Sequence, residues 1–429
     1  MHRRNWLQYA TYGAVGAYSC TWLPELAIAA DKAASEGRHC VLLWMGGGPS
    51  QIDTFDMKPD HPNGGSIKPA STNVPGISFS EHLPGLAKQA DKLAILRGMS
   101  TKEGDHERGT VLMRTGHIPG GPVAYPSIGS SLSKSLGDET SGLPNYVSVS
   151  PGAFGRNSIS PGFLGPKHMA TTVAGQAPND DSFAQLRVDY MDRAPDVSDS
   201  RQSARLDLWR AMQADFGRER TTRNVQAHNT IYESAHRMLA SDARDAFDLS
   251  LESAKVRESY GRGAFGQGCL MARRLIERGV PLVEVTLGQN LAWDTHNNNF
   301  DRVKELSTEL DAGWSTLMLD LADRGLLEKT TILWAGEFGR TPKINANGGR
   351  DHFPQAFSCV LAGAGVKGGA VYGETNKSGM EVTDGKMNQQ DLLATLCTAL
   401  GVNPLDENIA EGGRPIAIAE GSVIDEVLS

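Results

Sequence analysis

The sequence predicts an α/β protein of three layers, in which helices cover both faces of a mostly parallel sheet. Short apolar runs alternate with helical patterns along the chain, and these runs consist of continuous Val, Ile and Leu. Such runs are typical of strands that are buried on both faces of a parallel sheet. With 429 residues, 39% of them apolar and 21% charged, the chain can bury a large core.

Six strands are expected, each a short apolar run: Cys40–Met45, Leu93–Arg97, Asn145–Val149, Val280–Leu287, Thr330–Ala335 and Ser358–Ala362. Two helices are also expected. One follows Asn299 and carries apolar residues every three or four positions as far as Leu321, so that one stripe packs on the sheet. The other covers Asn388–Leu400 and ends at Gly401.

Residues 150–260 differ in composition from the rest of the chain. The segment Ser150–Asp181 is rich in Gly, Pro and Ser, and a charged helical stretch follows from Ser198 to about Ser253. We interpret residues 150–260 as a loop and a helical insertion or cap within one domain that covers residues 38–420. The charged residues of this stretch are expected to form a solvated helix face.

The first thirty residues have the pattern of an export signal. Arg3–Leu7 holds two adjacent arginines, a polar residue and an apolar pair, and a mildly apolar stretch follows from Tyr9 to Leu23. Residues 1–30 are therefore predicted to be a twin-arginine signal segment, with an ordinary first helix as the alternative. The expected partner is the twin-arginine export machinery, and the expected location is periplasmic or extracellular. No stretch reaches the ~20 apolar residues of a membrane span, so none is expected in the mature chain.

The charge and the cysteines exclude two classes of protein. Because residues 1–30 carry two arginines and one glutamate, the mature chain keeps 40 basic and 49 acidic side chains. This acidic balance excludes nucleic acid as a partner, which requires a basic surface. Four mature cysteines lie in apolar or amphipathic runs without any CxxC spacing, which predicts buried free thiols rather than a zinc cluster or disulfides: Cys40, Cys269, Cys359 and Cys397.

Four stretches near the ends of predicted strands are rich in ligand-type residues. In doubly wound sheets, ligands bind at the carboxyl ends of the strands. The first stretch, Met45–Asp56, contains Gly46–Gly48, whose amides can cradle an anion, and also Asp53; a plain tight turn is the alternative. The second, Gly104–Arg108, places His106 among charged residues, as a ligand, a base or a surface residue.

The third and fourth stretches carry the chemistry of a metal site. In Trp293–His296, an Asp-x-His spacing puts Asp294 and His296 on one side of an extended segment, as two ligands of one ion require. The fourth stretch has two parts, Gly336–Pro342 and Gly349–Pro354, with five candidate side chains: Glu337, Arg340, Arg350, Asp351 and His352. Carboxylates and imidazoles without a thiolate favour a divalent Zn, Mn, Mg or Ca ion, and arginines are suited to binding an anionic substrate.

These stretches resemble the bacterial domain of unknown function 1501 family, which is similar to the alkaline phosphatase and sulfatase superfamily. Trp293–His296 and Gly336–Pro342 are the most specific pieces, and Arg273–Val280 and Val371–Gly373 support them. The resemblance covers roughly residues 38–420. It implies an alkaline-phosphatase-like αβα sandwich and hydrolysis of phosphate or sulfate esters at a metal centre with an alcohol or formylglycine nucleophile.

The chain departs from that superfamily at three positions of the expected site. His106 stands on or near the position where Ser, Thr or Cys would be the nucleophile, because Leu112–Gly116 resembles the segment that follows it. Phe338 replaces a metal-binding residue, and Gly46–Gly48 replace a metal-binding Asp, for which Asp53 is the nearest substitute. The resemblance therefore implies one metal ion, held by Asp294, His296 and His352, with carboxylates added from Asp53, Glu337 or Asp351.

The sequence thus predicts an exported metal-dependent hydrolase that acts on an anionic small-molecule or glycan ester. In this prediction His106 is the base, a ligand or the reacting residue, Glu337 is a catalytic or ligating carboxylate, and Arg340 and Arg350 bind the anion. Two alternatives remain: a degenerate member that binds a glycan or an exported protein, and a metal-dependent mutase or transferase. The missing nucleophile and Phe338 favour the binding protein.

Overall fold

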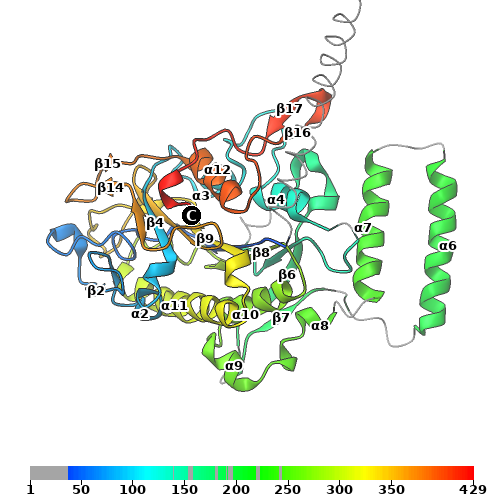
Figure 1. Ribbon diagram of the computed structural model, residues 1–429, viewed down its shortest axis with the longest axis horizontal. Helices are drawn as coiled ribbons and strands as arrows, with labels where there is room; N and C mark the ends of the chain where they lie inside the picture. Colours follow the sequence, from blue (N-terminus) through cyan, green and yellow to red (C-terminus); the bar gives the residue numbers. More distant parts are fainter. Residues whose placement is uncertain are drawn as a thin grey trace, which may run out of the picture.

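The computed structural model describes residues 37–138, 140–152, 158–178, 182–189, 191, 197–218, 223–240 and 244–429. The predicted signal segment lies outside these residues. A nine-stranded sheet crosses the middle of the molecule (Figure 1). Its strands are β1 (His39–Met45), β4 (Leu93–Met99), β5 (Tyr146–Val149), β6 (Thr171–Gln176), β7 (Gln185–Arg187), β8 (Leu282–Leu287), β9 (Thr330–Gly336), β12 (Phe357–Gly363) and β13 (Ala370–Tyr372).

The strand order is β13-β4-β12-β9-β1-β8-β5-β6-β7, with β1 between β8 and β9. β1 runs parallel to both of these neighbours, whereas β12 is antiparallel to β9 and β4, and β7 is antiparallel to β6. All six predicted strands are present, and the expected mostly parallel sheet is confirmed. The sequence missed β13 and β7, the three-residue strands at the two edges of the sheet, and β6, which lies next to β7.

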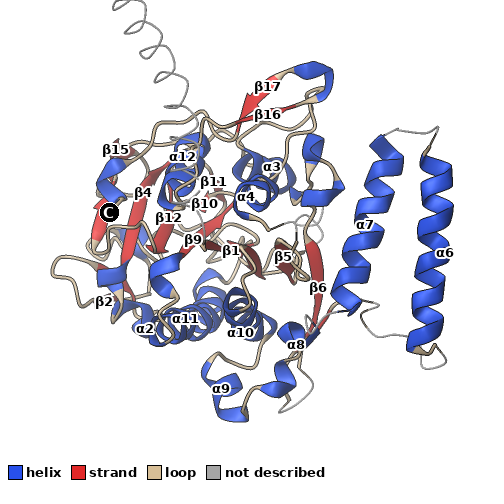
Figure 2. Cartoon of the chain, turned by 45° about the vertical axis from the view of Figure 1, so that its right-hand side comes forward, coloured by secondary structure: helices blue, strands red, loops and turns tan. Residues whose placement is uncertain are grey.

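Helices cover both faces of the sheet, which gives the three layers expected from the sequence (Figure 2). One layer consists of α2 (Pro84–Ala87), α10 (Ala264–Glu277) and α11 (Asn299–Asp323), and the other of α3 (His106–Thr115), α4 (Ile128–Leu136) and α12 (Gln389–Ala399). Successive residues of β1 alternate between the two cores, because neighbouring side chains of a strand point to opposite faces. The helices predicted after Asn299 and over Asn388–Leu400 are confirmed as α11 and α12.

Residues 150–260 contribute to the sheet as well as to helices. The loop predicted over Ser150–Asp181 contains β6, so that part of the loop prediction was wrong. This strand, with the sequence TTVAGQ, has little of the Val, Ile and Leu bulk of the central strands, because it is near the edge of the sheet. After it, α6 (Asp199–Gly217) and α7 (Arg223–Ala240) form a hairpin beside the sheet, with α6 on the outside (Figures 1 and 2).

Short helices α8 (Arg244–Phe247) and α9 (Ala254–Ser259) lead from the hairpin back to α10. Four small hairpins decorate the sheet: β2 (Pro69–Ser71) with β3 (Ser78–Ser80), β10 (Gly339–Arg340) with β11 (His352–Phe353), β14 (Glu374–Thr375) with β15 (Val382–Asp384), and β16 (Glu407–Ile409) with β17 (Pro415–Ala417). Among the described helices, none is long and apolar enough to cross a membrane.

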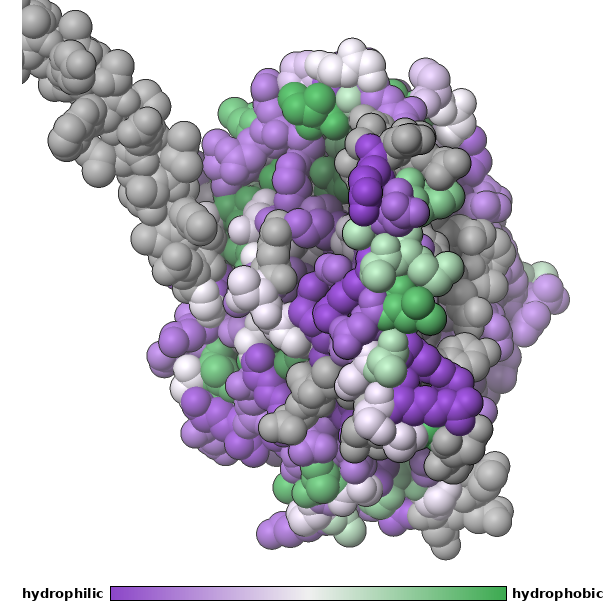
Figure 3. Space-filling model, turned by 90° about the vertical axis from the view of Figure 1, so that its right-hand side faces the viewer, coloured by the Kyte–Doolittle hydropathy of each residue, from purple (hydrophilic) through white to green (hydrophobic). Residues whose placement is uncertain are grey.

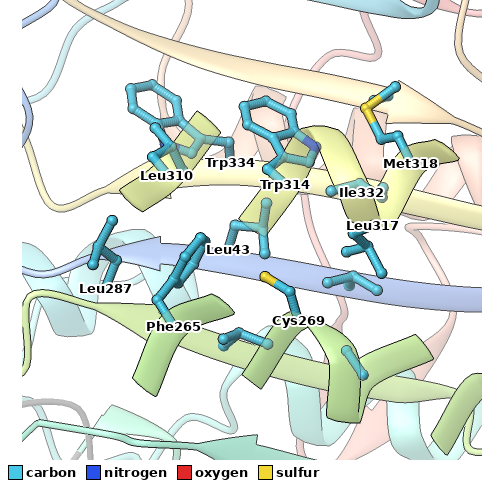
Figure 4. Packing of buried hydrophobic residues seen from close by; sticks show 14 of the residues in the cluster. Leu43, Phe265, Cys269, Leu287, Leu310, Trp314, Leu317, Met318, Ile332 and Trp334 are labelled. Carbon is cyan, nitrogen blue, oxygen red and sulfur yellow. The ribbon is translucent and has the colours of Figure 1, made fainter. Parts of the chain in front are cut away.

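The larger core lies between the sheet and the α10–α11 layer (Figure 4). Trp314 of α11 and Trp334 of β9 are both fully buried there, and Phe265 and Cys269 of α10 pack in the same cluster. The cysteines of the described chain, Cys40, Cys269, Cys359 and Cys397, are all buried and free, as the sequence predicted. This rigid core fixes the ends of the strands from which the candidate site is built.

Candidate metal site

The candidate site lies at the side of the sheet formed by the carboxyl ends of β1, β4, β8 and β9. His106 is the first residue of α3, after β4, and Asp294 and His296 lie in the loop that follows β8. Glu337 comes directly after β9. His352 precedes β12, and because β12 runs antiparallel to β9, the beginning of β12 lies at this same edge. Strand direction therefore brings together side chains that are as much as 246 positions apart in the chain.

Each of the three histidines has its Nδ1 atom anchored by an acceptor. Nδ1 of His106 lies 2.7 Å from Glu337 Oε1, and Nδ1 of His296 lies 2.8 Å from Asp351 Oδ1. Nδ1 of His352 lies 2.7 Å from the carbonyl oxygen of Gly104. An Nδ1–H that donates to such an acceptor fixes the ring and leaves Nε2 as the coordinating atom. All three rings are thus held in the orientation that metal-binding histidines adopt.

The free Nε2 atoms converge on the carboxylate of Asp294. His106 Nε2 lies 3.4 Å from Oδ2, and the Nε2 atoms of His296 and His352 lie 3.1 and 3.2 Å from Oδ1. Two ligands of a tetrahedral zinc ion, each ~2.0–2.1 Å from the metal, are about 3.3 Å apart. His106, Asp294 and His352 form a group that could hold a metal ion, with ligand atoms within 4.8 Å of one another.

The cluster is buried on one side and open on the other. The side chain of His106 is 11% exposed and that of His296 is 45% exposed, with Asp294 and His352 between them at 25% and 26%. His106 Nε2 is buried, and its contact with Asp294 Oδ2 at 3.4 Å is too long for a well-formed hydrogen bond. A buried imidazole nitrogen whose neighbour is a carboxylate oxygen at 3.4 Å fits a metal ligand, and the exposed side leaves the cluster open to an ion.

Two carboxylates and a guanidinium set the charge of the cluster. Burial lowers the pKa of His106, but the carboxylates of Asp294 and Glu337 outweigh this effect and raise it to about 9. Burial also raises the pKa of Asp294, yet His106, His352 and Arg340 together hold it well below its usual range. Asp294 is therefore ionised at neutral pH, and His106 must release a proton before it binds a metal ion.

Arg340 is occupied by the protein itself. Its side chain is fully buried, Nη1 lies 2.5 Å from Asp294 Oδ1, and its other nitrogens donate to the carbonyl groups of Gly47 and Gly48. Burial lowers the pKa of the guanidinium, and Asp294 opposes that shift. The structure thus places Arg340 behind Asp294 as its counter-ion, in contrast to the anion clamp expected from the sequence.

The glycine loop after β1 supports Glu337. The Gly47 amide donates to Glu337 Oε1 at 2.8 Å, so the anion that this loop cradles is a carboxylate of the protein. Gly47 has a φ of 111°, and a Cβ atom there would lie 2.5 Å from the Asp294 amide nitrogen. The sequence indicated that the amides of Gly46–Gly48 could hold an anion, though not which one. It gave no sign of the Gly104 carbonyl as a partner of His352, because every residue carries that group.

Asp53 and Arg350 form a separate buried pair. Arg350 Nε and Nη2 lie 2.7 and 2.9 Å from the two oxygens of Asp53, and Asn299 donates to one of them as well. Both oxygens of Asp53 are thus engaged away from the histidines. The structure therefore pairs Asp53 with Arg350 rather than with the histidines, and it engages the Arg350 guanidinium with groups of the protein itself.

Phe338 forms the inner wall of the cluster. Its ring is fully buried and packs against the rings of His106 and His352, with centroid distances of 4.9 and 4.7 Å. Phe338 therefore gives the cluster an apolar wall against which two imidazole rings pack. The arrangement fits one metal ion in front of Phe338.

Solved structures that are similar to this chain include three at 10–13% sequence identity. The lipoteichoic acid synthase LtaP from Listeria monocytogenes has 10% identity and a TM-score of 0.42, over 92% of this chain and 77% of that one. The sulfatase PsFucS1 from Pseudoalteromonas sp. has 13% identity and a TM-score of 0.39, over 85% and 68%. Ps i-CgsB in complex with k-i-k-neocarrahexaose has 11% identity and a TM-score of 0.40, over 85% of this chain and 72% of that one. At these TM-scores, the likenesses carry no argument about the site.

The family, in contrast, is shown by a match over nearly the whole described chain. No curated protein matches the sequence. A family model described as "Protein of unknown function (DUF1501)" matches residues 37–428, which include every residue of the histidine cluster. This range agrees with the one over which the motifs resemble that family. The chain belongs to the DUF1501 family.

Proposed function

We propose that this protein is an exported metal-dependent hydrolase that acts on an anionic ester. The observation that carries the proposal is the set of three imidazoles whose Nδ1 atoms are anchored and whose Nε2 atoms converge on Asp294. Fixing three rings so that their second nitrogens point at one carboxylate has a cost in side-chain entropy, and a bound cation would account for that arrangement.

His106, Asp294 and His352 are the proposed ligands. Three protein ligands with one position left open are typical of catalytic zinc sites, whereas structural zinc sites have four. A divalent ion bound there would polarise an ester oxygen and lower the pKa of a water molecule. Because Arg340 already neutralises Asp294, the charge of the cation remains available to attract an anionic group.

His296 is the proposed proton-transfer residue, in place of His106. It is the most exposed of the three histidines, and its Nε2 lies 3.1 Å from that of His352, beside the open position. Its hydrogen bond to Asp351 orients the ring, as a carboxylate does behind a general base. Asp351, predicted as a ligand or an orienting residue, takes the orienting role in this proposal.

A second candidate is a binding protein that has lost catalysis. Phe338 at a ligand position and His106 at the nucleophile position favour it, because they remove two groups on which the superfamily's chemistry relies. The two candidates differ in turnover. A protein that holds one equivalent of metal and hydrolyses no phosphate or sulfate ester would be this binding protein.

Metal content is the first test. The protein would be purified from its export compartment as wild type, Asp294→Ala and Glu305→Ala, the last being an exposed acid on α11 and thus a matched control. Mass spectrometry should find about one equivalent of Zn or Mn in wild type and the control and almost none in Asp294→Ala. Retention of metal in Asp294→Ala would refute the ligand set. If the expected result is found, the metal-loaded wild-type protein would be screened against phosphate and sulfate esters.

The export route has its own test. Replacing Arg3 and Arg4 by lysine should leave the protein in the cytoplasm, because the twin-arginine pair is the feature that the export machinery reads. Immunodetection in cell fractions would follow its location. Unchanged export of the lysine variant would remove the support for this pathway without affecting the metal site.

A further inference from the structure

The α6–α7 hairpin has a large share of the exposed apolar side chains. Thirteen large hydrophobic side chains are exposed among the described residues, and five of them lie on these two helices: Leu208, Met212, Phe216, Ile231 and Tyr232. Of these, Tyr232 stacks on Trp209 between the two helices, whereas several large apolar side chains on one helix face usually mark a contact with another molecule. The hairpin supplies no residue to the metal site, so this surface needs a separate explanation.

Three of these residues form one stripe along α6. Leu208, Met212 and Phe216 follow one another at intervals of four, which places them on one side of the helix, and they are 63%, 62% and 46% exposed. A different side of α6 faces α7, where Leu206 is buried and Trp209 stacks on Tyr232 at 4.4 Å. Figure 3, which looks onto this outer face, shows hydrophobic side chains bordered by hydrophilic ones.

The stripe has a sequence symmetry about Arg210. Leu208 and Met212 lie two residues on either side of this position, and Arg205 and Asp215 lie five residues on either side. Ala204 and Phe216 lie six residues away on either side, so that a small side chain corresponds to a large one. By the helical period of 3.6 residues, these positions share the stripe, whereas Arg210 itself points to the opposite side.

We propose that α6 pairs antiparallel with α6 of a second copy of this chain, around a two-fold axis at Arg210. In this arrangement, Leu208 of each copy contacts Met212 of the other, and Arg205 of each copy faces Asp215 of the other. Phe216 packs over the small side chain of Ala204. A two-fold interface uses the same patch on both copies, so it requires this kind of self-complementary pattern.

Charge complementarity favours a second copy over other occupants. Arg205 stands towards the beginning of the stripe and Asp215 towards its end, so an antiparallel copy pairs opposite charges at both ends of the interface. The Arg218–Asp215 pair within α6 is highly exposed, at 3.7 Å, and is too weak to prevent this exchange. A membrane surface would instead favour basic residues throughout the border of the stripe.

The apolar contact is tested by sedimentation of the full mature chain over a range of concentrations. Wild type should form a dimer, and the double variant Leu208→Glu, Met212→Glu should raise the dissociation constant roughly 30-fold or more, as central interface residues do. Leu405→Glu is the matched control, because Leu405 is 62% exposed on another part of the molecule. Circular dichroism and metal content should be the same in all of these proteins.

The register is tested by a charge exchange. Arg205→Asp and Asp215→Arg should each weaken the dimer, because each places like charges opposite one another, and the double exchange should restore it. A wild-type chain that stays monomeric, or a double exchange no better than the single ones, would overturn the proposal. Loss of the metal without loss of the dimer would affect only the proposed function, since the hairpin and the site share no residue.

Discussion

At Gly47, a single hydrogen atom in place of a side chain allows two loops to meet. The Cβ of an alanine there would lie 2.5 Å from the Asp294 amide nitrogen and 2.8 Å from the Leu291 carbonyl oxygen. Gly47→Ala should therefore shift Asp294, reduce metal binding at least tenfold and destabilise the fold by about 1–3 kcal/mol. Gly120→Ala is the control, because Gly120 has a similar φ of 102° and nothing within 4 Å of its Cβ position.

Isothermal titration of metal-free Gly47→Ala would measure its metal affinity, and thermal unfolding would measure its stability, so that the two effects are separated. Both variants share the strain of a positive φ, so only the clash distinguishes them. Equal metal affinities in Gly47→Ala and wild type would contradict the role given to the glycine loop.

Glu337 is expected to act on metal affinity through His106. In Glu337→Gln, the amide oxygen can still accept hydrogen bonds from Gly47 and His106, but the negative charge that supports the imidazole is lost. Removing such an outer partner typically costs 10–100-fold in metal affinity. Competition with a chelating dye would measure this loss, and Glu337→Gln should bind more weakly than wild type but more tightly than His106→Ala.

The sequence predicted which residues belong to the site but not which groups each of them contacts. The Asp-x-His spacing and the residues around positions 106, 337 and 352 predicted side chains that the structure does bring together. Asp53 was predicted to bind the metal ion, and Arg340 and Arg350 to bind a substrate anion. The structure instead pairs Arg340 with Asp294 and Arg350 with Asp53. A buried arginine needs a carboxylate wherever it lies, and which carboxylate it meets depends on the three-dimensional path of the chain.

The segment around Glu252 is tied to helix α10 by an ion-pair cluster. Glu252 Oε2 lies 3.0 Å from Arg273 Nη2, and Oε1 lies 2.5 Å from Arg274 Nη1. Burial would raise the pKa of Glu252, but the two arginines outweigh it and lower the pKa from its ordinary value of 4.5. Since the folded pKa is lowered, the stabilisation is present above pH 4.5 and is lost as the pH falls through the folded value.

Glu252→Gln should therefore lower the free energy of unfolding by about 2 kcal/mol at pH 7. The difference from wild type should shrink as the pH falls below about 4. Urea unfolding at several pH values would measure both. Glu305→Gln is the comparison, because the Arg302–Glu305 pair is exposed and is expected to contribute less than about 0.5 kcal/mol.

Strands were predictable where burial left a composition signal. The six central strands are continuous apolar runs, because helices cover both of their faces. β6, with its small and polar residues, and β13, with three residues, lack that signal, and hydrogen bonding to a neighbouring strand defines them instead. The direction of β12 had no local signal either, although it brings His352 to the same edge as Asp294.

For the whole molecule, a bound ion would link segments that are far apart in the chain. The proposed ligands follow β4, follow β8 and precede β12, so they meet only in the folded protein. Zn or Mn at 100 times its dissociation constant should stabilise the fold by about 2.7 kcal/mol. Thermal unfolding with and without metal should show this as a higher Tm in wild type and Glu305→Ala, and no change in Asp294→Ala.

The four buried cysteines can report local unfolding, because a thiol-reactive reagent reaches each of them only when the structure around it opens. Burial raises the pKa of the Cys397 thiol to about 12 and that of Cys40 further still, so neither forms the thiolate that reacts with alkylating reagents. Cys40 lies in β1, Cys359 in β12, Cys269 in α10 and Cys397 in α12, so each layer of the sandwich contains a thiol. The order in which a maleimide labels them during unfolding would show which layer separates from the sheet first.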